Sequence, residues 1–537
     1  MLDDDASNGD SRHSGLGRSV LGWTHFNAGA FGQSLQRPGQ WVTHAAAWAS
    51  HLMFCHAGET LKTIEQETRR TSKTTLDTRS LKTTLTELVK RAGADYAEIR
   101  LEDSVETALS FMGRNLENVS ESHLYGGNAR VLVNGCWGFV TFNSLDELEQ
   151  NVREAVQNAR LASRLAHDKS VLAPITPVDD TVQLDLISDP RQVSLENKIA
   201  LFGAYNERIL SHKGVTSSAV RYFDRYTRLY YANSDGTWLD RELMDMGYAA
   251  SAIATKNGIT ARGSTSQGGR NNFNLFKGME KEVEQAAIDA VESLEAPVVK
   301  GGSYTVVCDP HLAGVFVHEA FGHLSEGDNI ADDPRMQDVL KLGRKFGGDY
   351  LNIYDTGLDL GLRGYLKYDD EGVPTQRTNL ITNGVLTGRL HSRETAGRMG
   401  EKPTGNARAL TYRFPPIPRM RNTCIGPGPH GALADLIKDV KEGIYALDSA
   451  GGQTNGELFT FTAGKAYMIR DGKIAERVRD VTIGGNVFDT LRNITGVASD
   501  FDVRDGAGGC GKGGQMPLPV SHGSPHIKIK DVVIGGK

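Results

Sequence analysis

Hydrophobic residues recur at helical spacing in some parts of the chain and alternate with polar residues in others, which separates predicted helices from predicted half-buried strands. Helical spacing predicts helices at residues 81–89, 145–166, 195–210 and 281–294. Alternation predicts strands at residues 96–101, 130–142, 220–232, 237–254 and 259–263. Asn134 followed by Gly135 marks a hairpin turn inside the second of these strand segments. The first half therefore predicts a mixed α/β lobe with an antiparallel meander.

The second half opens with a predicted strand at 304–308 that leads into one predicted helix at 309–328. Beyond it, Asn383-Gly384 and Asp471-Gly472 lie between alternating segments, so this half is expected to be largely antiparallel β with short helices. The predicted fold class is α+β. The expected division of the chain is a flexible N-terminal extension at 1–72, an α+β domain at 73–296 and a second domain at 297–537.

The predicted helix at 309–328 carries two histidines and a glutamate. His318 and His323 are five residues apart, and Glu319 follows the first of them. On a regular helix this spacing separates two side chains by about 140°, too far to bind one ion together. We therefore expect a π-bulge or local unwinding, which Gly322 directly before His323 would favour. With a third ligand, the pattern is typical of a zinc site that has a glutamate as its base.

The composition argues against several classes of protein. The formal net charge is −6 and Lys and Arg are spread along the chain, whereas a nucleic-acid binder needs a concentrated basic surface. No run approaches the roughly 18 apolar residues of a membrane-spanning helix. Five scattered cysteines and an acidic start without the features of a signal peptide indicate a reducing compartment. A cytoplasmic protein is expected.

A glycine-rich stretch near the C-terminus carries one thiol, Cys510, and six of the nine positions 506–514 are glycine. The stretch matches the start of a dinucleotide fingerprint and of a P-loop, but both motifs must open a helix. Pro517 and Pro519 cannot continue a helix, and Gly513 stands where a P-loop needs Ser or Thr. The glycines instead favour a loop that approaches the predicted helix and delivers Cys510 as a thiolate. The alternative is an idle loop cysteine.

Four sequence blocks stand out in the second half of the chain. They are V-H-E-A-F-G-H-L-S-E-G-D at 317–328, S-R-E-T-A at 392–396, G-N-A-R at 405–408, and G-G-C-G-K-G-G-Q at 508–515 with the later S-H-G-S-P-H-I-K-I. In combination they resemble the TldD branch of the TldD/PmbA family, which are zinc metallopeptidases. The resemblance extends from about residue 81 to the C-terminus and leaves the first 72 residues unmatched. The sister branch, PmbA, lacks the metal motif that this chain keeps.

The resemblance implies Zn²⁺ as the cofactor, with His318, His323 and Cys510 as its ligands and Glu319 as the catalytic base. Two imidazoles and a thiolate leave a fourth tetrahedral position for water, as in catalytic zinc sites. Glu319 would activate this metal-bound water and pass its proton to the departing amine. The expected function of the domain at 297–537 is therefore peptide-bond hydrolysis. Long antiparallel segments would hold unfolded proteins or short peptides by their backbone, which gives low sequence preference.

The resemblance also implies a site enclosed by two subunits, either a homodimer or a heterodimer with a PmbA-like chain. The domain at 73–296 would then be the substrate or partner lobe. Two other functions stay open. One is a non-catalytic regulatory or partner subunit, since members of the family are described as modulators of DNA gyrase. The other is a zinc hydrolase of a non-peptide amide. No nucleic-acid or membrane partner is expected.

Several other side chains could compete for the role of metal ligand. They are Cys308, His311, His391, His522 and His526. The last two are four residues apart, but Gly523 and Pro525 preclude a helix between them. His522 and His526 are therefore expected to form a wall of the site or to bind substrate.

Four polar residues of the resembling blocks are expected to line or brace the substrate cleft. They are Arg393, Glu394, Asn406 and Arg408. Buried structural ion pairs explain their presence equally well, because a charge removed from water must be paired.

Overall fold

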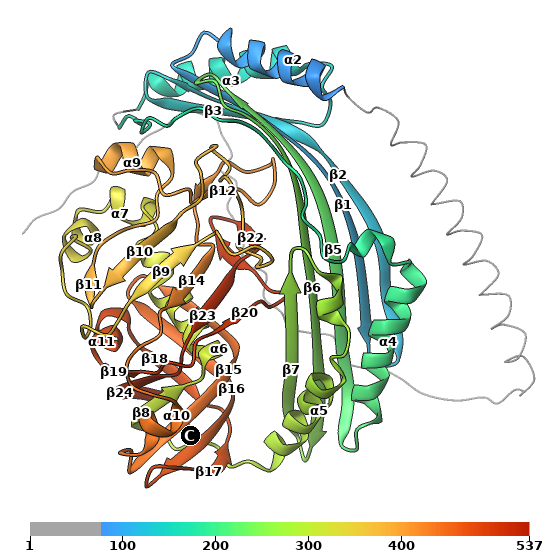
Figure 1. The fold of residues 1–537 in the computed structure, drawn as a ribbon, viewed down its shortest axis with the longest axis vertical. Helices are drawn as coiled ribbons and strands as arrows, with labels where there is room; N and C mark the ends of the chain where they lie inside the picture. Colours follow the sequence, from blue (N-terminus) through green and yellow to red (C-terminus); the bar gives the residue numbers. More distant parts are fainter. Residues whose placement is uncertain (1–76, 167, 536–537) are drawn as a thin grey trace, which may run out of the picture. The chain divides into compact units, whose positions relative to one another are not determined.

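Long antiparallel strands dominate the first half of the structure (Figure 1). The computed structural model describes residues 77–535 apart from residue 167, so the predicted extension at 1–72 lies outside the described residues. One sheet has the strand order β3-β2-β1-β5-β6-β4, and β7 pairs with β6. Its strands are β1 (Tyr96–Met112), β2 (Asn115–Val133), β3 (Cys136–Phe142), β4 (Asp179–Val182), β5 (Val215–Asn233), β6 (Trp238–Lys256) and β7 (Ile259–Gly269).

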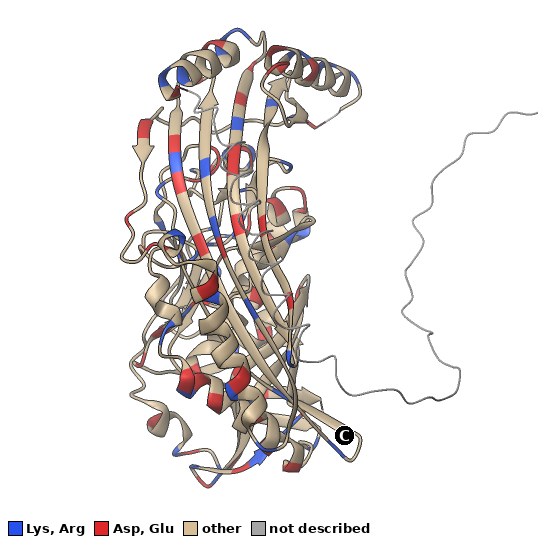
Figure 2. Cartoon of the chain, turned by 90° about the vertical axis from the view of Figure 1, so that its right-hand side faces the viewer, with Lys and Arg blue, Asp and Glu red and all other residues tan. Residues whose placement is uncertain are grey.

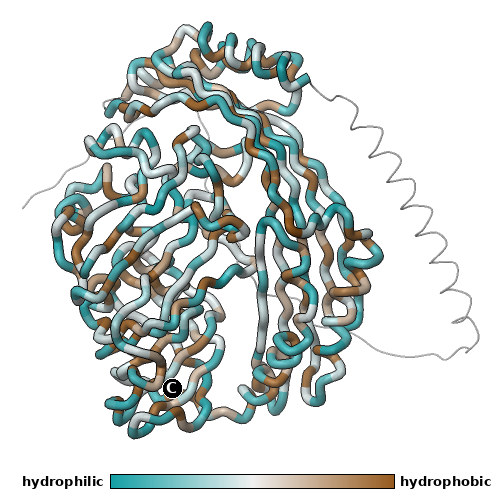
Figure 3. Tube along the Cα trace, in the orientation of Figure 1, coloured by the Kyte–Doolittle hydropathy of each residue, from teal (hydrophilic) through white to brown (hydrophobic). Residues whose placement is uncertain are grey.

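The predicted helices of this half are confirmed, and they pack on the sheet. They are α2 (Thr78–Lys90), α3 (Leu148–Ser163), α4 (Leu195–Ser211) and α5 (Glu280–Glu295), with 3₁₀ turns at Pro190–Gln192 and Phe273–Phe276. Leu85 of α2 and Val152 of α3 share one buried cluster with β1 and β2, while Phe202 of α4 and Ala287 of α5 share another with β5 and β6. Hydrophobic and hydrophilic positions alternate along the long strands (Figure 3), as a strand with one face on a core requires.

The strands are longer than the sequence pattern predicts, although the turns between them are as expected. Asn134 and Gly135 have φ values of 50° and 79°, the left-handed pair that a two-residue hairpin turn needs. β1 continues to Met112, eleven residues beyond the predicted end at Leu101. Its backbone pairs with β2 on one side and β5 on the other along nearly its whole length. Strand pairing therefore extends the sheet where the hydrophobic alternation has already weakened.

The second half contains two larger sheets with the helix α6 (Pro310–Val317) packed against strands of both. One sheet has the order β15-β8-β24-β18-β16-β17, with β19 beside β24, and the other has the order β11-β10-β9-β14-β23-β20. Most neighbours are antiparallel, but β8 pairs parallel with β15 and β14 pairs parallel with β23. The mostly antiparallel sheets and short helices confirm the predicted α+β class.

The remaining elements of this half are short. The strands are β8 (Gly302–Cys308), β9 (Ile353–Thr356), β10 (Arg377–Thr382), β11 (Val385–Leu386), β12 (Ala407–Arg408), β13 (Ile417–Pro418), β14 (Asn422–Ile425), β15 (Glu442–Asn455), β16 (Leu458–Arg470), β17 (Lys473–Val478), β18 (Thr482–Asn486), β19 (Ile494–Val497), β20 (Asp502–Arg504), β21 (Cys510–Lys512), β22 (Gln515–Leu518), β23 (Ser521–Ser524) and β24 (Ile527–Gly535). The helices after α6 are α7 (Asp328–Ala331), α8 (Pro334–Val339), α9 (Arg393–Met399), α10 (Leu433–Ile437) and α11 (Val487–Arg492).

The single helix predicted at 309–328 is wrong in its extent. α6 ends at Val317, a π-helical turn follows at His318–Gly322, and a 3₁₀ turn closes the segment at His323–Ser325. Glu326 is extended, with φ −73° and ψ 125°, so the helix stops before the predicted end. The Glu326 side chain is fully buried, and its carboxylate pairs with His323 and Lys512. These contacts favour the extended backbone of Glu326 over a helical one.

Buried ion pairs join the first sheet to the second half. The guanidinium of Arg100 on β1 lies 3.2 Å from the Asp370 carboxylate, and Arg241 on β6 lies 2.9 Å from the same group. Arg130 on β2 contacts Glu371 at 3.2 Å. Figure 2 shows acidic and basic positions interspersed along the long strands. These pairs favour one arrangement of the two halves, because an unmatched buried charge would be strongly destabilising.

Among the described residues, no helix combines the length and the apolar composition that crossing a membrane requires.

Candidate metal centre

The helix α6 starts where β8 ends and is fixed by its own first residues. The Asp309 carboxylate accepts a hydrogen bond from the Leu312 N–H at 2.8 Å, and Pro310 occupies the first turn. Leu312 and Phe316 are buried in the core between the two sheets. This packing fixes the direction of α6, so the residues that follow Val317 enter the interior at a defined place.

The predicted deformation of the helix is present as the π-helical turn at His318–Gly322. It brings the rings of His318 and His323 to a centroid distance of 5.3 Å at an interplanar angle of 84°. Gly322 itself has ordinary helical angles, φ −57° and ψ −51°. A Cβ at this position would lie 2.0 Å from the Met420 sulfur. Gly322 is therefore needed for close packing against Met420, and not for the backbone freedom that was predicted from the sequence.

The glycine-rich stretch forms a hairpin of strands, β21 and β22, and opens no helix. Gly513 and Gly514 provide its two-residue turn with φ values of 57° and 75°. The hairpin places the Cys510 sulfur 3.4 Å from Nε2 of His323. One potential ligand atom from each of His318, His323 and Cys510 lies within 4.8 Å of the others. The structure thus brings together three side chains that are far apart in the sequence.

Electrostatics in this cluster favour the metal-binding form of the thiol. Burial raises the pKa of the Cys510 thiol, but the adjoining His318 and His323 imidazoles outweigh burial and hold this pKa well below its ordinary range. Burial lowers the pKa of His323, but Glu326 and Cys510 outweigh burial and raise this pKa to about 11. Cys510 is therefore favoured as a thiolate, the form of cysteine that binds a metal ion. A metal ion would displace the imidazole proton and bind the thiolate directly.

The donor set fits a zinc ion. Cys510 and His318 are almost completely buried, and Nδ1 of His318 has no hydrogen-bond partner among the described residues. An unpartnered buried nitrogen costs free energy unless another group occupies the space beside it. A thiolate and two imidazoles are ligands that Zn²⁺ prefers, and three protein ligands leave one tetrahedral position open.

Glu326 and Lys512 support His323 on the side of its ring that does not face Cys510. This role was not predicted from the sequence for either residue. The Glu326 carboxylate lies 3.1 Å from Nδ1 of His323 and 2.8 Å from the Lys512 ammonium. Lys512 also contacts the Asp328 carboxylate at 2.5 Å. Burial raises the pKa of Glu326, but Lys512 and His323 outweigh burial and lower it to about 2. The Glu326 carboxylate accepts a hydrogen bond from Nδ1 of His323 and orients the ring so that Nε2 faces the sulfur.

Replacing Glu326 by Gln is expected to weaken zinc binding by about 10- to 100-fold, because the amide no longer orients His323 as a carboxylate does. Competition with a chromogenic chelator measures the zinc dissociation constant of each variant. Glu401→Gln is the matched control, since Glu401 contacts His391 in the same way at 3.1 Å. A Glu326→Gln protein that binds zinc as tightly as the parent would exclude this supporting role.

Glu319 stands at the open side of the cluster. Its side chain is 27% exposed, and its Oε2 lies 3.9 Å from Nε2 of His323. It lines a pocket of about 720 Å³ together with His323 and Lys512, and a second pocket of about 140 Å³ together with His318 and Cys510. A carboxylate that faces two solvent-accessible pockets beside the three candidate ligands is placed to exchange protons with water.

Two residues that the sequence argument missed hold the Cys510 strand in place. The Arg363 guanidinium binds the Asp245 carboxylate of β6 at 2.7 Å, and its Nη1 donates to the carbonyls of Gly506, at 2.6 Å, and Gly508. Arg419 donates to the Cys510 carbonyl at 2.8 Å. Both arginines are buried. Each arginine donates to carbonyls of residues that are far away in the sequence, so no local sequence signal could have identified either one.

The other predicted ligand candidates lie outside the cluster. His311 contacts the Asp448 carboxylate at 3.2 Å and His391 contacts Glu401 at 3.1 Å. Burial raises the pKa of the Cys308 thiol far above its ordinary range, so that this thiol is inert. Among the described residues, only His318, His323 and Cys510 form a group of three or more potential ligands at metal-binding distance.

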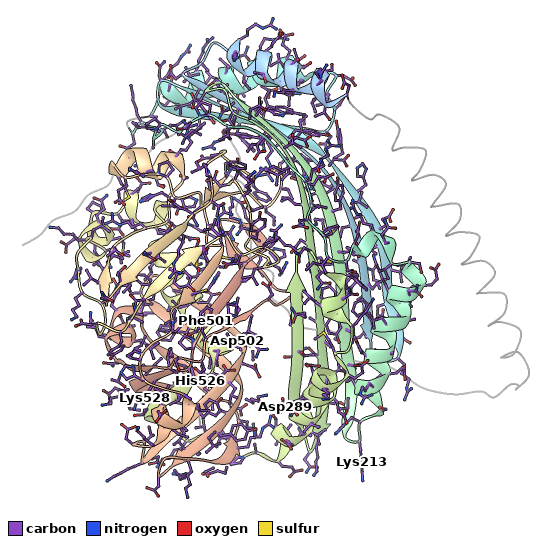
Figure 4. The ribbon with its side chains drawn as sticks, in the orientation of Figure 1. Lys213, Asp289, Phe501, Asp502, His526 and Lys528 are labelled. Atoms are coloured by element: carbon purple, nitrogen blue, oxygen red, sulfur yellow. The ribbon has the colours of Figure 1, made fainter. Side chains whose placement is uncertain are left out.

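The predicted substrate-binding residues occupy different places. His522 lines the 140 Å³ pocket beside His318 and stacks on His311 at a centroid distance of 5.3 Å. His526, labelled in Figure 4, contacts Asp500 at 2.8 Å and the Tyr445 hydroxyl at 3.0 Å, and it lines neither pocket at Glu319. His522 therefore remains a candidate for the wall of the site, and the contacts of His526 are those of a structural residue.

The four polar residues of the resembling blocks are all paired within the protein: Arg393 and Glu394 with the first half of the chain, and Asn406 and Arg408 within the second half. Arg393 contacts Asp235 at 2.7 Å, and Glu394 accepts a hydrogen bond from the Trp137 indole at 3.0 Å. Asn406 donates to the Asp355 carboxylate at 2.9 Å. Arg408 donates to the carbonyls of Met420 and Pro519, both at 2.6 Å. These contacts support the structural alternative, and a direct role in substrate binding stays a prediction.

Comparison with known proteins places the chain in a family. Models of the PmbA/TldA metallopeptidase match in three parts: domain 1 at residues 97–163, the central domain at 188–294 and the C-terminal domain at 301–536. The candidate metal cluster lies in the third part.

Individual relatives agree with the family models. A metalloprotease of Synechocystis is 47% identical over 462 residues, which cover 85% of this chain and 98% of the relative. A zinc metalloprotease TldD homolog of Saccharolobus solfataricus is 30% identical over 455 residues, which cover 83% of this chain and 97% of the relative. The crystal structure of TldE from Thermococcus kodakarensis shares the fold, with a TM-score of 0.65 at 20% identity over 85% of this chain and 100% of that chain. The resemblance drawn from the sequence is confirmed, and the chain belongs to the PmbA/TldD family of metallopeptidases.

Proposed function

We propose that this protein is a zinc-dependent peptidase of the HExxxH type, in which His318, His323 and Cys510 hold the ion and Glu319 is the base. The observation that carries the proposal is the approach of the three potential ligand atoms to within 4.8 Å of one another beside an accessible carboxylate. The name of the Saccharolobus solfataricus relative, a zinc metalloprotease, supports the choice of metal.

Different residues of this chain have different roles in the proposed peptide hydrolysis. When bound, zinc supplies Lewis acidity that lowers the pKa of water and polarises the peptide carbonyl. The Glu319 carboxylate takes the proton from the attacking water and later transfers it to the amine nitrogen as the C–N bond breaks. Glu326 keeps His323 oriented. Cys510 is buried whereas the Glu319 side chain is partly exposed, so substrate would reach the cluster past Glu319.

The strand β15 supports the proposal that substrate binds by its backbone. β15 pairs with β16 along its length, whereas β8 lies beside it only at Gly443–Ala446 among the described residues. Gln453 and Thr454, in the part beyond β8, line the 720 Å³ pocket at Glu319. A peptide could add to this edge as a further strand, which needs an unfolded chain and little sequence preference.

Removal of the metal tests the proposed function. The purified zinc-loaded protein is expected to cleave an unstructured peptide, to lose this activity with a chelator and to regain it with added zinc, because Glu319 alone cannot activate water sufficiently. The same sequence held in a folded protein should resist cleavage. Cleavage that is insensitive to the chelator would contradict the proposal. A metal-dependent activity that acts only on a non-peptide amide would show instead that the protein is a hydrolase of another class.

A further inference from the structure

A small cavity lined by both halves of the chain is rich in arginine. Its volume is about 70 Å³, and it shares no lining residue with the two pockets at Glu319. Four arginines line it: Arg100 of β1, Arg225 of β5, Arg270 directly after β7 and Arg408 of β12. The charged residues opposite them are three carboxylates, Glu102, Asp245 and Asp370. We call this space the arginine cavity.

The three carboxylates of the arginine cavity are already engaged by other groups. The Asp245 carboxylate binds the Arg363 guanidinium at 2.7 Å. The Asp370 carboxylate binds Arg241 at 2.9 Å. The Glu102 carboxylate accepts a hydrogen bond from a backbone N–H at 2.8 Å. Most of their charge is therefore matched outside the set of four arginines.

Two buried arginines of the cavity form no ion pair among the described residues. Arg270 donates to the carbonyls of Arg363 and Met244, at 2.8 and 3.4 Å. Arg408 likewise donates to two backbone carbonyls. Nε of Arg100 is also buried and has no hydrogen-bond partner in the described part of the chain. A carbonyl satisfies a donor but carries no net charge, and a buried charge without a counter-ion is strongly destabilising.

Other guanidinium groups increase the positive potential in this region. Burial, together with Arg421 and Arg270, lowers the pKa of Arg408 well below its ordinary range. Burial and the nearby Arg363 lower the pKa of Arg270, although the Asp245 carboxylate partly offsets them. Cations that disfavour one another at close range attract an anion strongly, because the low dielectric of the interior strengthens both interactions.

The size and the lining of the cavity select the class of anion. A volume of about 70 Å³ has room for roughly two water molecules or one small ion, at about 30 Å³ for each water. A guanidinium group presents its N–H donors as a planar fork, which matches two oxygens of one oxyanion. Leu229 and Leu518 also line the cavity and keep bulk water out. The Arg225 side chain is 36% exposed, so an ion can enter on this side.

We propose that the arginine cavity binds one small oxyanion of the phosphate or sulfate class between Arg270 and Arg408. The bound ion would join the first sheet to the second half of the chain, because the two arginines belong to different halves. It would stabilise the folded protein by supplying the counter-charge that the neighbouring side chains do not supply. This site goes beyond the proposed function, since it requires neither zinc nor a peptide.

Calorimetric titration of the zinc-loaded protein with inorganic phosphate tests the proposal. The titration is done in about 0.15 M chloride, so that screening of charge stays constant. One phosphate per chain is expected, with a Kd of about 1 mM or tighter. Arg270→Gln should weaken this Kd at least about tenfold, because one fork is lost. Arg208→Gln is the matched control, since Arg208 lies on the surface of α4 and pairs with Glu284 at 2.9 Å. It should change the Kd by less than about twofold.

Arg225→Gln repeats the test should Arg270→Gln fail to fold, because Arg225 is partly exposed and its loss leaves the interior intact. This variant should weaken phosphate binding at least about threefold, and sulfate should compete with phosphate for the parent protein. Absence of saturable binding in chloride, or an equal Kd for the Arg270→Gln, Arg225→Gln and Arg208→Gln proteins, would overturn the proposal.

Removal of zinc separates this site from the metal centre. The Kd for phosphate should stay within about twofold after a chelator has removed the zinc, because the arginine cavity and the pockets at Glu319 have no lining residue in common. Phosphate binding that disappears with the zinc would place the ion on the metal and overturn the proposal. A protein that cleaves no peptide but binds phosphate through Arg270 would contradict the proposed function alone.

Discussion

Replacing Glu319 by Gln is expected to abolish peptide cleavage while the zinc content stays unchanged. Glutamine has the same shape but cannot accept the proton of the attacking water, and the loss of a general base lowers kcat by about 10²- to 10⁴-fold. Glu319 is not one of the three clustered ligands, and its carboxylate lies 3.9 Å from the nearest imidazole nitrogen. Zinc analysis of the purified variant and steady-state kinetics on an unstructured peptide measure both quantities.

Glu457→Gln is the matched control for this experiment. Glu457 lines the same 720 Å³ pocket as Glu319, but it pairs with Arg335 and touches no candidate ligand. A change of kcat below about threefold is expected for the control, since a partly exposed ion pair contributes little. Normal cleavage by Glu319→Gln would show that another group is the base.

Replacing His318 or Cys510 by Ala is expected to remove both zinc and activity. Three side chains hold the ion in the proposed site, and two donors cannot retain it against a chelator. The loss in zinc affinity should exceed the roughly 100-fold effect of a supporting residue such as Glu326. Metal analysis after dialysis, with competition titration for the affinity, measures the loss.

Cys424→Ala is the control for the removal of a thiol. Cys424 is also buried, but burial and the nearby Asp355 carboxylate raise the pKa of its thiol to about 12, so that it does not form a thiolate. This variant should keep its zinc and its activity. If Cys510→Ala kept a full complement of zinc instead, the sulfur would have no place among the ligands.

Local patterns predicted those features that depend on neighbouring residues. The five-residue spacing of His318 and His323 demanded a distorted helix, and the π-helical turn is there. The Asn134-Gly135 turn and the helices of the first half also follow from local propensity. Cys510 came from the glycine-rich sequence together with the family resemblance, because nothing local distinguishes this thiol from an idle one.

Features that depend on distant partners were missed. The helix stops at Ser325 because the buried Glu326 carboxylate pairs with Lys512, which is far away in the sequence. The long strand β1 continues because β2 and β5 flank it. Arg363 binds the Asp245 carboxylate, which is 118 residues away in the sequence. In each case the deciding contact is absent from the local sequence window.

X-ray absorption at the zinc edge tests the central claim most directly, because it reports the atoms around the ion. The account predicts one sulfur at about 2.3 Å and two imidazole nitrogens at about 2.0–2.1 Å in the parent protein. The sulfur signal should disappear in any zinc that Cys510→Ala retains. A first shell made only of nitrogen and oxygen in the parent protein would contradict the account.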